Sequence, residues 1–255
     1  MNLIITAGGT RERIDAVRAI TNDATGRLGS LIGEEFSQRL VNQEHNIYYL
    51  CGMGAVTPNI NNVGLHIIYI EGTDQLLSEM KRLLTSLKID AVIHSMAVSD
   101  YKVSNVTTLE EVTQTFYQEG HKLLNKGNYE DWQKAILKAV QGKPLIGQQK
   151  ISSDLDHPLL MLEKTPKIIG MIKEASPQTT LVGFKLLSGV SKENLIDTAY
   201  NLLLKNKCDY VLANDTHLIR EDKHVGYLID KEKNYKTFTN KKEIAKGIAD
   251  CLLIK

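Results

Sequence analysis

The stretch Leu3-Ile4-Ile5-Thr6-Ala7-Gly8-Gly9-Thr10-Arg11-Glu12 decides the fold of this chain, together with the residues that follow it as far as Leu40. An apolar run that ends in two glycines is typical of a buried strand that stops where its backbone turns sharply or approaches another group closely. Gly26 and Gly29 then lead into residues 31–40, where apolar side chains recur at helical spacing. A strand, a glycine-bearing loop and a helix form the layout in which N–H groups at a helix start can hold an anion. The stretch therefore suggests a nucleotide- or phosphate-binding α/β protein, with close helix-to-strand packing as the alternative interpretation of the glycines.

Strands and helices alternate along most of the remaining sequence. Further strands are predicted at residues 46–52, 65–70, 90–97, 180–185 and 209–213, with amphipathic helices between them, for example at 73–87 and 191–205. This alternation predicts a Rossmann-like, doubly wound α/β fold with a mainly parallel sheet and helices on both faces. Residues 226–230 and 235–238 predict a C-terminal β-hairpin, and residues 241–253 predict a closing helix.

Residues 103–150 interrupt the alternation. They are polar and mixed in character, hold the only tryptophan, Trp132, and are too long for an ordinary connection in an α/β domain. We predict an inserted arm or flap here, with a helical subdomain that serves only packing as the alternative. The alternation resumes with a strand at 159–162 and a helix with Pro166 in its first turn. We treat residues 1–255 as a single domain that carries this arm.

Composition narrows the classes of function. The 31 Lys and Arg residues nearly balance 30 Asp and Glu residues, and a net charge of +1 gives no overall attraction to nucleic acid or to an acidic membrane. Cys51, Cys208 and Cys251 are odd in number and far apart, which argues against a disulfide framework or a Cys-x-x-Cys metal site and fits a core role. No run of about 18 apolar residues is present, and no signal sequence opens the chain, so we expect a cytoplasmic protein.

Ligands of an open parallel sheet gather beyond the carboxyl ends of its strands, so the residues that follow each predicted strand form a candidate rim. Small residues, amides and carboxylates predominate there. The rim comprises Gly8-Gly9-Thr10-Arg11, Gly52-Met53-Gly54, Ser95-Met96-Ala97-Val98-Ser99-Asp100-Tyr101, Phe184-Lys185 and Asn214-Asp215-Thr216. Such a rim leaves room for a ligand and offers it hydrogen-bond partners.

Each polar candidate also has a structural interpretation. Asp100 suits a ribose or a metal ion, but equally a turn or helix cap, and Asn214-Asp215 also fits an Asx-turn at a strand end. Lys150 also fits an ordinary surface lysine, and Lys205 lies near a helix C-terminus, where the helix dipole favours a cation. His94 fits a core residue better than a base. The sequence lacks a P-loop, a Gly-x-Gly-x-x-Gly fingerprint after the first strand and histidines at metal-ligand spacing.

Taken in order, these stretches resemble the phosphopantothenoylcysteine synthetase (phosphopantothenate–cysteine ligase) family of coenzyme A biosynthesis. The resemblance rests on residues 5–29, on Ala97-Val98-Ser99-Asp100-Tyr101, on Lys150-Ile151-Ser152-Ser153, on Gly183-Phe184-Lys185 and on Ala213-Asn214-Asp215. These motifs span almost the whole chain. The family's activity is often fused to a flavin-dependent decarboxylase, for which this sequence has no room, so the resemblance implies the stand-alone form.

The resemblance implies a two-step ligation. The carboxylate of 4′-phosphopantothenate attacks the α-phosphate of CTP or ATP, with Mg²⁺, to give an acyl-nucleotide and pyrophosphate, and the amine of L-cysteine then displaces the nucleotide. Such chemistry needs preorganised donors and cations rather than a protein nucleophile, and no catalytic triad is visible in the sequence. We favour CTP over ATP, although Lys150-Ile151-Ser152-Ser153 and the long insert before it look more like the eukaryotic form.

The resemblance also implies roles for individual residues. Asn22 would hydrogen-bond the activated acyl group, and Lys150 would serve phosphate binding or the cysteine step. The remaining nucleotide contacts would come from Gly8, Gly9, Thr10, Gly26, Ser95, Ala97, Asp100 on the ribose, Phe184, Lys185 and Lys205. Arg18, Asn214 and Asp215 would contact the substrates. No protein metal ligand is indicated. Family members are homodimers joined through an arm, a role that residues 103–150 would fill.

Two other hypotheses remain open from the sequence. The chain could be a non-catalytic nucleotide- or NAD(P)-binding module, although the dinucleotide fingerprint and the acidic residue expected after the second strand are missing. It could also be a purely structural scaffold, in which Asn22→Asp would be functionally silent.

Overall fold

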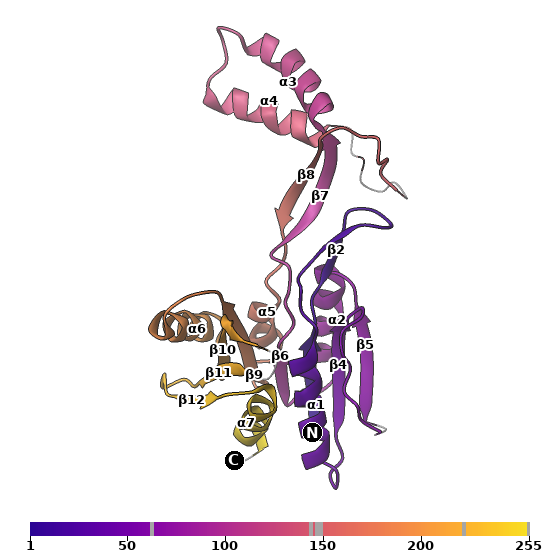
Figure 1. The fold of residues 1–255 in the computed structure, drawn as a ribbon. Coiled ribbons are helices and arrows are strands. Elements are labelled where there is room, and N and C mark those ends of the chain that lie inside the picture. The colour runs from indigo at the N-terminus through magenta and orange to yellow at the C-terminus, as the bar shows by residue number, and fades with distance from the viewer. Residues whose placement is uncertain (62–63, 143–144, 146–149, 221–222, 254–255) are drawn as a thin grey trace. The chain divides into compact units, whose positions relative to one another are not determined.

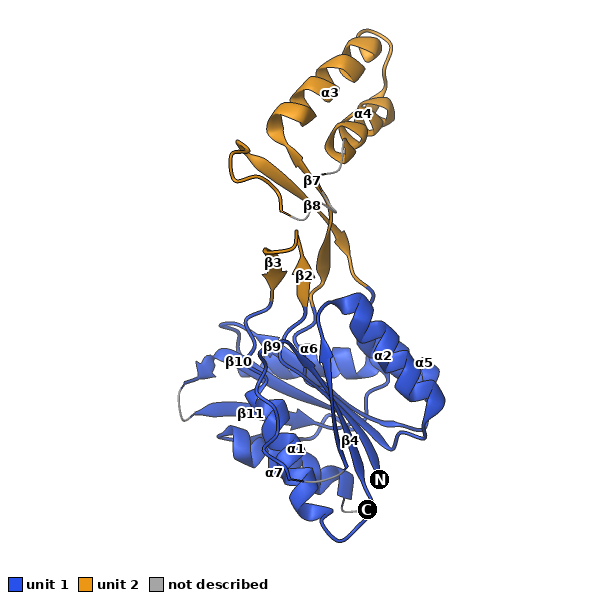
Figure 2. Cartoon of the chain, turned by 90° about the vertical axis from the view of Figure 1, so that its right-hand side faces the viewer, with its two compact units in different colours: residues 1–10, 22–98, 166–255 blue, residues 11–21, 99–165 orange. Residues whose placement is uncertain are grey.

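The computed structural model describes residues 1–61, 64–142, 145, 150–220 and 223–253. The chain forms two compact units: unit 1 comprises residues 1–10, 22–98 and 166–255, and unit 2 comprises residues 11–21 and 99–165 (Figure 2). Unit 2 is larger than the arm predicted at 103–150, because it also includes the flanking residues 99–102 and 151–165 and a segment from near the N-terminus. Residues 143–144 and 146–149 of the predicted arm lie outside the described residues.

Unit 1 is built on an eight-stranded sheet of order β12-β11-β10-β9-β6-β1-β4-β5 (Figure 1). Its strands are β1 (Asn2–Ala7), β4 (Asn46–Gly52), β5 (Leu65–Ile70), β6 (Ala91–His94), β9 (Thr180–Leu187), β10 (Tyr210–Ile219), β11 (His224–Ile229) and β12 (Tyr235–Phe238). The first six of these pair in parallel, and β11 and β12 are antiparallel. The predicted Rossmann-like fold and C-terminal hairpin are confirmed.

Helices cover both faces of this sheet. α1 (Arg27–Arg39) and α7 (Lys241–Leu253) pack with Leu3 and Ile5 of β1 on one face. α2 (Thr73–Ser86), α5 (Ile168–Ala175) and α6 (Lys192–Asn206) pack with Ile4 on the other. Alternate residues of a strand point to opposite faces, so a strand buried on both faces is apolar throughout. This explains the continuous apolar run that opens the sequence.

The loop between β1 and α1 is more elaborate than predicted. It contains a short antiparallel hairpin, β2 (Arg11–Arg13) paired with β3 (Ala19–Thr21), and this hairpin belongs to unit 2. Three-residue strands are too short to show an alternating pattern, so the hairpin left no signal in the sequence.

The rest of unit 2 consists of β7 (Tyr101–Thr108), α3 (Leu109–Leu123), α4 (Tyr129–Gln141) and β8 (Pro158–Lys164). Thr108 caps α3, and Asn128 with Asp131 forms a capping box at α4. The strand predicted at 159–162 is present, but it pairs with β7 in antiparallel fashion in a separate sheet, so it does not resume the alternation of the main sheet. A short apolar run does not by itself reveal which strand it will pair with.

None of the helices in the described ranges is long and apolar enough to cross a membrane.

Candidate functional site

The strand order of unit 1 reverses between β1 and β6. From β1 the chain builds the sheet outward through β4 and β5, and from β6 it builds in the other direction through β9 and β10. Ligands of doubly wound sheets bind beyond the carboxyl ends of the strands at such a switch point. The residues that follow these two strands, Gly8–Thr10 and Ser95–Ala97, are therefore the centre of the candidate site.

The backbone of Ala97 connects the two sides of the switch point. Its N–H donates to the carbonyl of Gly8 at 2.8 Å. Its carbonyl accepts from the N–H of Thr10 at 3.1 Å and from Nδ2 of Asn22 at 3.0 Å. Asn22 is half-buried, so its side-chain amide is held at the carboxyl end of β6 rather than left to rotate in solvent. The structure thus brings together four of the predicted residues, namely Gly8, Thr10, Asn22 and Ala97.

Two glycines of the opening motif are required by their surroundings. Gly8 has φ +76°, and a Cβ added to Gly9 would lie 2.6 Å from the carbonyl oxygen of Asn22. Both findings fit the interpretation that the backbone turns and approaches another group closely here. A side chain at Gly8 or Gly9 would therefore clash with the residues around it.

The start of α1 lies in the same unit and begins without a side-chain cap. Its N-cap residue, Gly26, is in the left-handed conformation with φ 75° and has no side chain to cap the helix. The N–H of Arg27 makes one long hydrogen bond, to Oγ1 of Thr25 at 3.4 Å. An uncapped helix start offers N–H donors and the positive end of the helix dipole to an anion. This geometry suits the phosphate-binding role predicted for Gly26.

Thr6 and His94 form a buried polar pair next to the switch point, one near the end of β1 and the other at the end of β6. Oγ1 of Thr6 accepts from the N–H of Met96 at 3.1 Å and forms a hydrogen bond with Nδ1 of His94 at 3.0 Å. Burial lowers the pKa of His94 to about 4, because the charged imidazolium would lose its solvation. His94 is therefore a neutral core residue, as predicted, and not a base. Ser95 donates its hydroxyl to the carbonyl of Thr6.

Phe184 and Lys185 lie on β9 just beyond the level at which β6 ends. Gly183 is the register partner of His94, the last residue of β6, so the next two residues of β9 continue past it. Both side chains are half-buried. The structure thus places Phe184 and Lys185 at the same edge of the sheet as Ser95 and Ala97.

Asn214 and Asp215 are already engaged within the protein. Nδ2 of Asn214 donates to Nε2 of the buried His224 at 3.0 Å. The carboxylate of Asp215 accepts the N–H groups of Gly189, Val190 and His217, and these hydrogen bonds lower its pKa. Asp215 therefore shapes the loop between β9 and α6, and its predicted contact with substrate stays a prediction.

Lys205 is not brought to the switch point. It lies exposed in the last turn of α6, whereas α6 starts at the carboxyl edge of the sheet. A helix of 15 residues spans about 22 Å, so the side chain begins near the opposite edge. The helix-dipole interpretation of Lys205 fits this position, and its predicted phosphate contact gains no support from the geometry.

The other three candidates belong to unit 2. Arg18 is tied to Asp15, as its Nε and Nη2 donate to Oδ2 of that carboxylate at 2.9 and 2.6 Å. Asp100 is exposed, and its carbonyl accepts from the N–H of Thr165 at 3.0 Å. Lys150 is exposed and directly precedes the buried Ile151.

Asp15 was missed by the sequence reasoning. Its side chain is 1% exposed, and the hydrogen bond from Arg18 is the largest of the contacts that hold the pKa of its carboxyl well below the usual range. The only available signal was an aspartate three residues before an arginine, a spacing that is common at turns.

Two of the cysteines are buried and are not activated as nucleophiles. Burial raises the pKa of Cys51 to about 11 and that of Cys208 to about 12, so both thiols stay protonated. Among the described residues, no group of three His, Cys, Asp or Glu side chains could hold a metal ion.

The fold and the site define a Rossmann-like α/β protein with a ligand site at the carboxyl edge of its sheet. That site combines a glycine loop, a fixed amide and a helix start without a side-chain cap at a topological switch point. The sequence matches the model of the family described as the DNA/pantothenate metabolism flavoprotein C-terminal domain over residues 1–115 and 144–254. The chain belongs to this family.

Individual relatives and solved structures similar to this chain agree with the family assignment. The chain is 29% identical over 250 residues to a coenzyme A biosynthesis bifunctional protein, CoaBC, from Thermococcus kodakarensis, covering 97% of this chain and 50% of that protein. It thus spans about half the length of the curated relatives it matches. The crystal structure of the DNA/pantothenate metabolism flavoprotein from Streptococcus pneumoniae is 34% identical, with a TM-score of 0.78 over 99% of this chain and 98% of that one. The C-terminal domain of a CoaBC protein shares the fold, with a TM-score of 0.63 at 20% identity over 99% of this chain and 96% of that one.

Proposed function

We propose that this protein is a phosphopantothenate–cysteine ligase of coenzyme A biosynthesis. It joins 4′-phosphopantothenate and L-cysteine to give 4′-phosphopantothenoylcysteine through an acyl-nucleotide, with release of pyrophosphate. The observation that carries the proposal is the Asn22 amide, held on Ala97 at the switch point between the glycine loop and the uncapped start of α1. Membership of the family and the similarity to CoaBC proteins of coenzyme A biosynthesis support the same activity.

In the first step, a carboxylate oxygen of phosphopantothenate bonds to the α-phosphorus and pyrophosphate leaves. In the second, the cysteine amine bonds to the acyl carbon and the nucleoside monophosphate leaves, carrying that oxygen with it. Both steps place negative charge on oxygens, which preorganised N–H donors stabilise in the transition state. An uncharged amide such as Asn22 can serve the acyl oxygen without being attacked or deprotonated.

The nucleotide is proposed to occupy the carboxyl edge of unit 1. The backbone of Gly8, Gly9 and Thr10 and the start of α1 suit phosphate, and Ser95, Ala97, Phe184 and Lys185 line the neighbouring strand ends. Asn214 and Asp215 lie in the middle of β10, where its parallel pairing with β9 ends. The roles of Lys150, Arg18 and Asp100, which belong to unit 2, rest on the family resemblance alone.

CTP is the proposed nucleotide, with ATP as the alternative. Mg²⁺ would be bound mainly through the triphosphate, since Mg²⁺ commonly takes one or two carboxylates plus substrate phosphates rather than an all-protein cage. The described residues fit this mode, because no group of three His, Cys, Asp or Glu side chains among them could hold a metal ion by itself.

We also propose that the protein acts as a cytoplasmic homodimer joined through unit 2. Leu160 and Leu162 stand on one face of β8 and are 43% and 47% exposed. Two adjacent exposed leucines on a strand are typical of a surface that a partner covers. Neither a nucleic acid nor a membrane is needed as a partner.

One observation favours a second candidate, a non-catalytic NAD(P)-binding module. The parallel strands follow the order found in dinucleotide-binding domains. However, the end of β4 carries Gly52-Met53-Gly54 in place of the acidic residue that would bind the ribose.

The test supplies phosphopantothenate, L-cysteine, Mg²⁺ and either CTP or ATP to the full chain. We expect equal amounts of pyrophosphate and phosphopantothenoylcysteine, with one triphosphate clearly preferred. If neither triphosphate supports product formation while NAD(P)H binds tightly, the ligase assignment fails and the second candidate stands.

A further inference from the structure

We propose that Asp15 is a positioning residue that fixes the backbone beside Lys150, acting together with Arg18 as a clamp on the Ile151 peptide. This inference rests on the proposed function, because it concerns how a residue with a proposed role in that reaction is held. All four residues belong to unit 2, so the contacts that carry it lie within one compact body.

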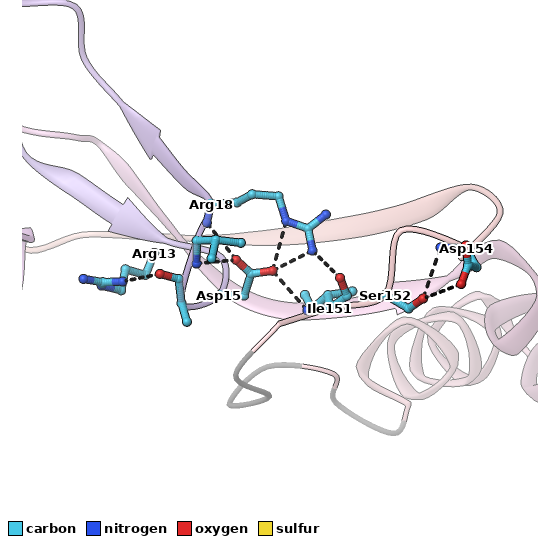
Figure 3. A network of polar contacts seen from close by, with 8 residues as sticks. Arg13, Asp15, Arg18, Ile151, Ser152 and Asp154 are labelled. Carbon is cyan, nitrogen blue, oxygen red and sulfur yellow. Dashed lines mark hydrogen bonds and ion pairs between the residues drawn. The ribbon is translucent and has the colours of Figure 1, made fainter.

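The carboxylate of Asp15 binds backbone N–H groups of the turn in which Asp15 itself lies. Oδ1 accepts the N–H groups of Val17 at 2.9 Å and of Arg18 at 2.7 Å. Oδ2 accepts Nε and Nη2 of Arg18, so the guanidinium lies against the carboxylate in a fixed direction (Figure 3). Charge-assisted hydrogen bonds of this kind are among the stronger ones in proteins.

The same pair then binds both polar groups of a distant residue. The N–H of Ile151 donates to Oδ2 of Asp15 at 3.1 Å, and the carbonyl of Ile151 accepts from Nη2 of Arg18 at 2.6 Å (Figure 3). Asp15 and Ile151 are 136 positions apart in the sequence. One hydrogen bond is accepted from Ile151 and the other is donated to it, so the two bonds fix the orientation of the Ile151 backbone as well as its position.

The side chain of Ile151 adds a third anchor. It is 3% exposed and packs in an apolar cluster with Val103 and Val106 of β7. Ile14 and Ile20 of the β2–β3 hairpin pack against the same cluster. Polar and apolar contacts therefore hold Ile151 to the hairpin from both the backbone and the side chain.

Lys150 is the residue next to this anchor, and its own side chain is exposed. Within the described ranges, its ammonium makes no hydrogen bond or ion pair. Because neighbouring Cα atoms are about 3.8 Å apart, fixing Ile151 fixes the point from which the Lys150 side chain extends. The ammonium is left available for a ligand, while the entropy lost on placing it is partly removed in advance.

The test is a double-mutant cycle on turnover in the full chain. The clamp predicts that Asp15→Asn lowers kcat by about 10- to 100-fold, since a small misplacement of a reacting group can cost that much. Lys150→Gln should lower kcat by a similar or larger factor, and the double variant should be no slower than Lys150→Gln alone, because Asp15 acts through Lys150. Asp154→Asn is the matched control: it is an exposed carboxylate in the same segment, its hydrogen bonds among the described residues are with Ser152, and it should keep wild-type kcat.

A second measurement reports the clamp without relying on activity. Amide hydrogen exchange should accelerate at Ile151 in Asp15→Asn, while the β7–β8 pairs keep their protection. If Asp15→Asn does not fold, Asp15→Glu keeps the charge but displaces the carboxylate from Ile151, and its loss of kcat should again disappear in the Lys150→Gln background. The proposal is overturned if the losses multiply, if kcat is unchanged in the single clamp variant, or if exchange at Ile151 is unaffected. Failure of the proposed function looks different, because the wild-type protein itself would then form no product.

Discussion

At the scale of single residues, the proposed chemistry depends on which polar atoms are hydrogen-bonded within the protein and how they are held. The carbonyl of Ala97 accepts two hydrogen bonds and so fixes Asn22. The carboxylate of Asp215 and the imidazole of His94, by contrast, are committed to the protein itself. Fixed but uncharged donors are suited to stabilising charge that develops during a reaction.

Replacing Asn22 tests this reasoning. In Asn22→Asp the donor to Ala97 is lost, so we expect a loss of stability of about 1–3 kcal/mol. Turnover should fall by a larger factor, about 100- to 1000-fold, because a donor to the acyl oxygen is removed. Steady-state kinetics and thermal melting measure the two effects. Asn206→Asp is the matched control, since Nδ2 of Asn206 donates to a backbone carbonyl at the far end of α6, and its kcat should stay unchanged. Wild-type kcat in Asn22→Asp would remove Asn22 from the mechanism.

The buried His94 gives a pH dependence of stability. Its pKa is about 4 in the folded chain and roughly 6.5 when unfolded, so the unfolded state binds more protons between these values. The stability that His94 contributes is fully present above the unfolded pKa and is lost as the pH falls toward 4, by about 3 kcal/mol. Burial also lowers the pKa of His224, which acts in the same direction.

Urea unfolding at pH values between about 6.5 and 4.5 measures the slope of the free energy of unfolding against pH. In His94→Gln the slope should fall by close to one proton relative to the wild type. An unchanged slope would mean that His94 is not held neutral in the fold.

Much of the candidate site could be predicted from residue types, and some of it could not. The glycine loop and the residues after β6 were identified because they follow apolar strands, whereas Asn22 was identified through the family resemblance. The Asx-turn interpretation anticipated the bond from the N–H of His217 to Asp215. The bonds from Gly189 and Val190, 26 and 25 positions away, and the Asp15 clamp on Ile151, 136 positions away, were not predicted, because such distant partners leave no local pattern.

At the scale of elements, close contact between α1 and β1 sets the geometry of the switch point. A Cβ added to Gly29 would lie 2.6 Å from Cβ of Ala7 and 3.1 Å from Oγ of Ser95. The alternative interpretation of the glycines, helix-to-strand packing, is thus correct for Gly29, while Gly26 serves the helix start.

Gly29→Ala should therefore destabilise the protein by about 1–3 kcal/mol, as overpacking does. Gly170→Ala is the matched control, since Gly170 is also the third residue of its helix, α5, and the nearest atom to an added Cβ is 3.5 Å away. That variant should be neutral or more stable by about 0.5–1 kcal/mol, because alanine loses less conformational entropy than glycine. Equal effects of the two substitutions in chemical unfolding would contradict the packing argument.

The elements themselves were predicted to different degrees. Long periodic helices and strands buried on both faces, such as α2 and β1, follow directly from their patterns. β2 and β3 were too short to see, and the pairing of β8 with β7 rather than with the main sheet depends on tertiary contacts that a local apolar run does not encode.

At the scale of the whole molecule, the proposed dimer follows from apolar side chains that unit 2 leaves exposed. Wild-type protein should sediment at twice the 28.5 kDa of one chain. Combining Leu160→Ser with Leu162→Ser should shift it toward the monomer, because two apolar contacts are lost at the interface. Leu204→Ser is the control, as Leu204 is 55% exposed on α6 of unit 1. A monomeric wild type, or a double variant that remains dimeric, would rule out this surface.

The central claim is that the switch point forms an acyl-nucleotide, and isotope transfer tests it most directly. Phosphopantothenate labelled with ¹⁸O in its carboxylate is converted with L-cysteine, Mg²⁺ and the preferred triphosphate, and the released nucleotide is analysed by mass spectrometry. If the carboxylate attacks the α-phosphate, one labelled oxygen appears in the nucleoside monophosphate. Label in inorganic phosphate, with a nucleoside diphosphate as the other product, would contradict the account.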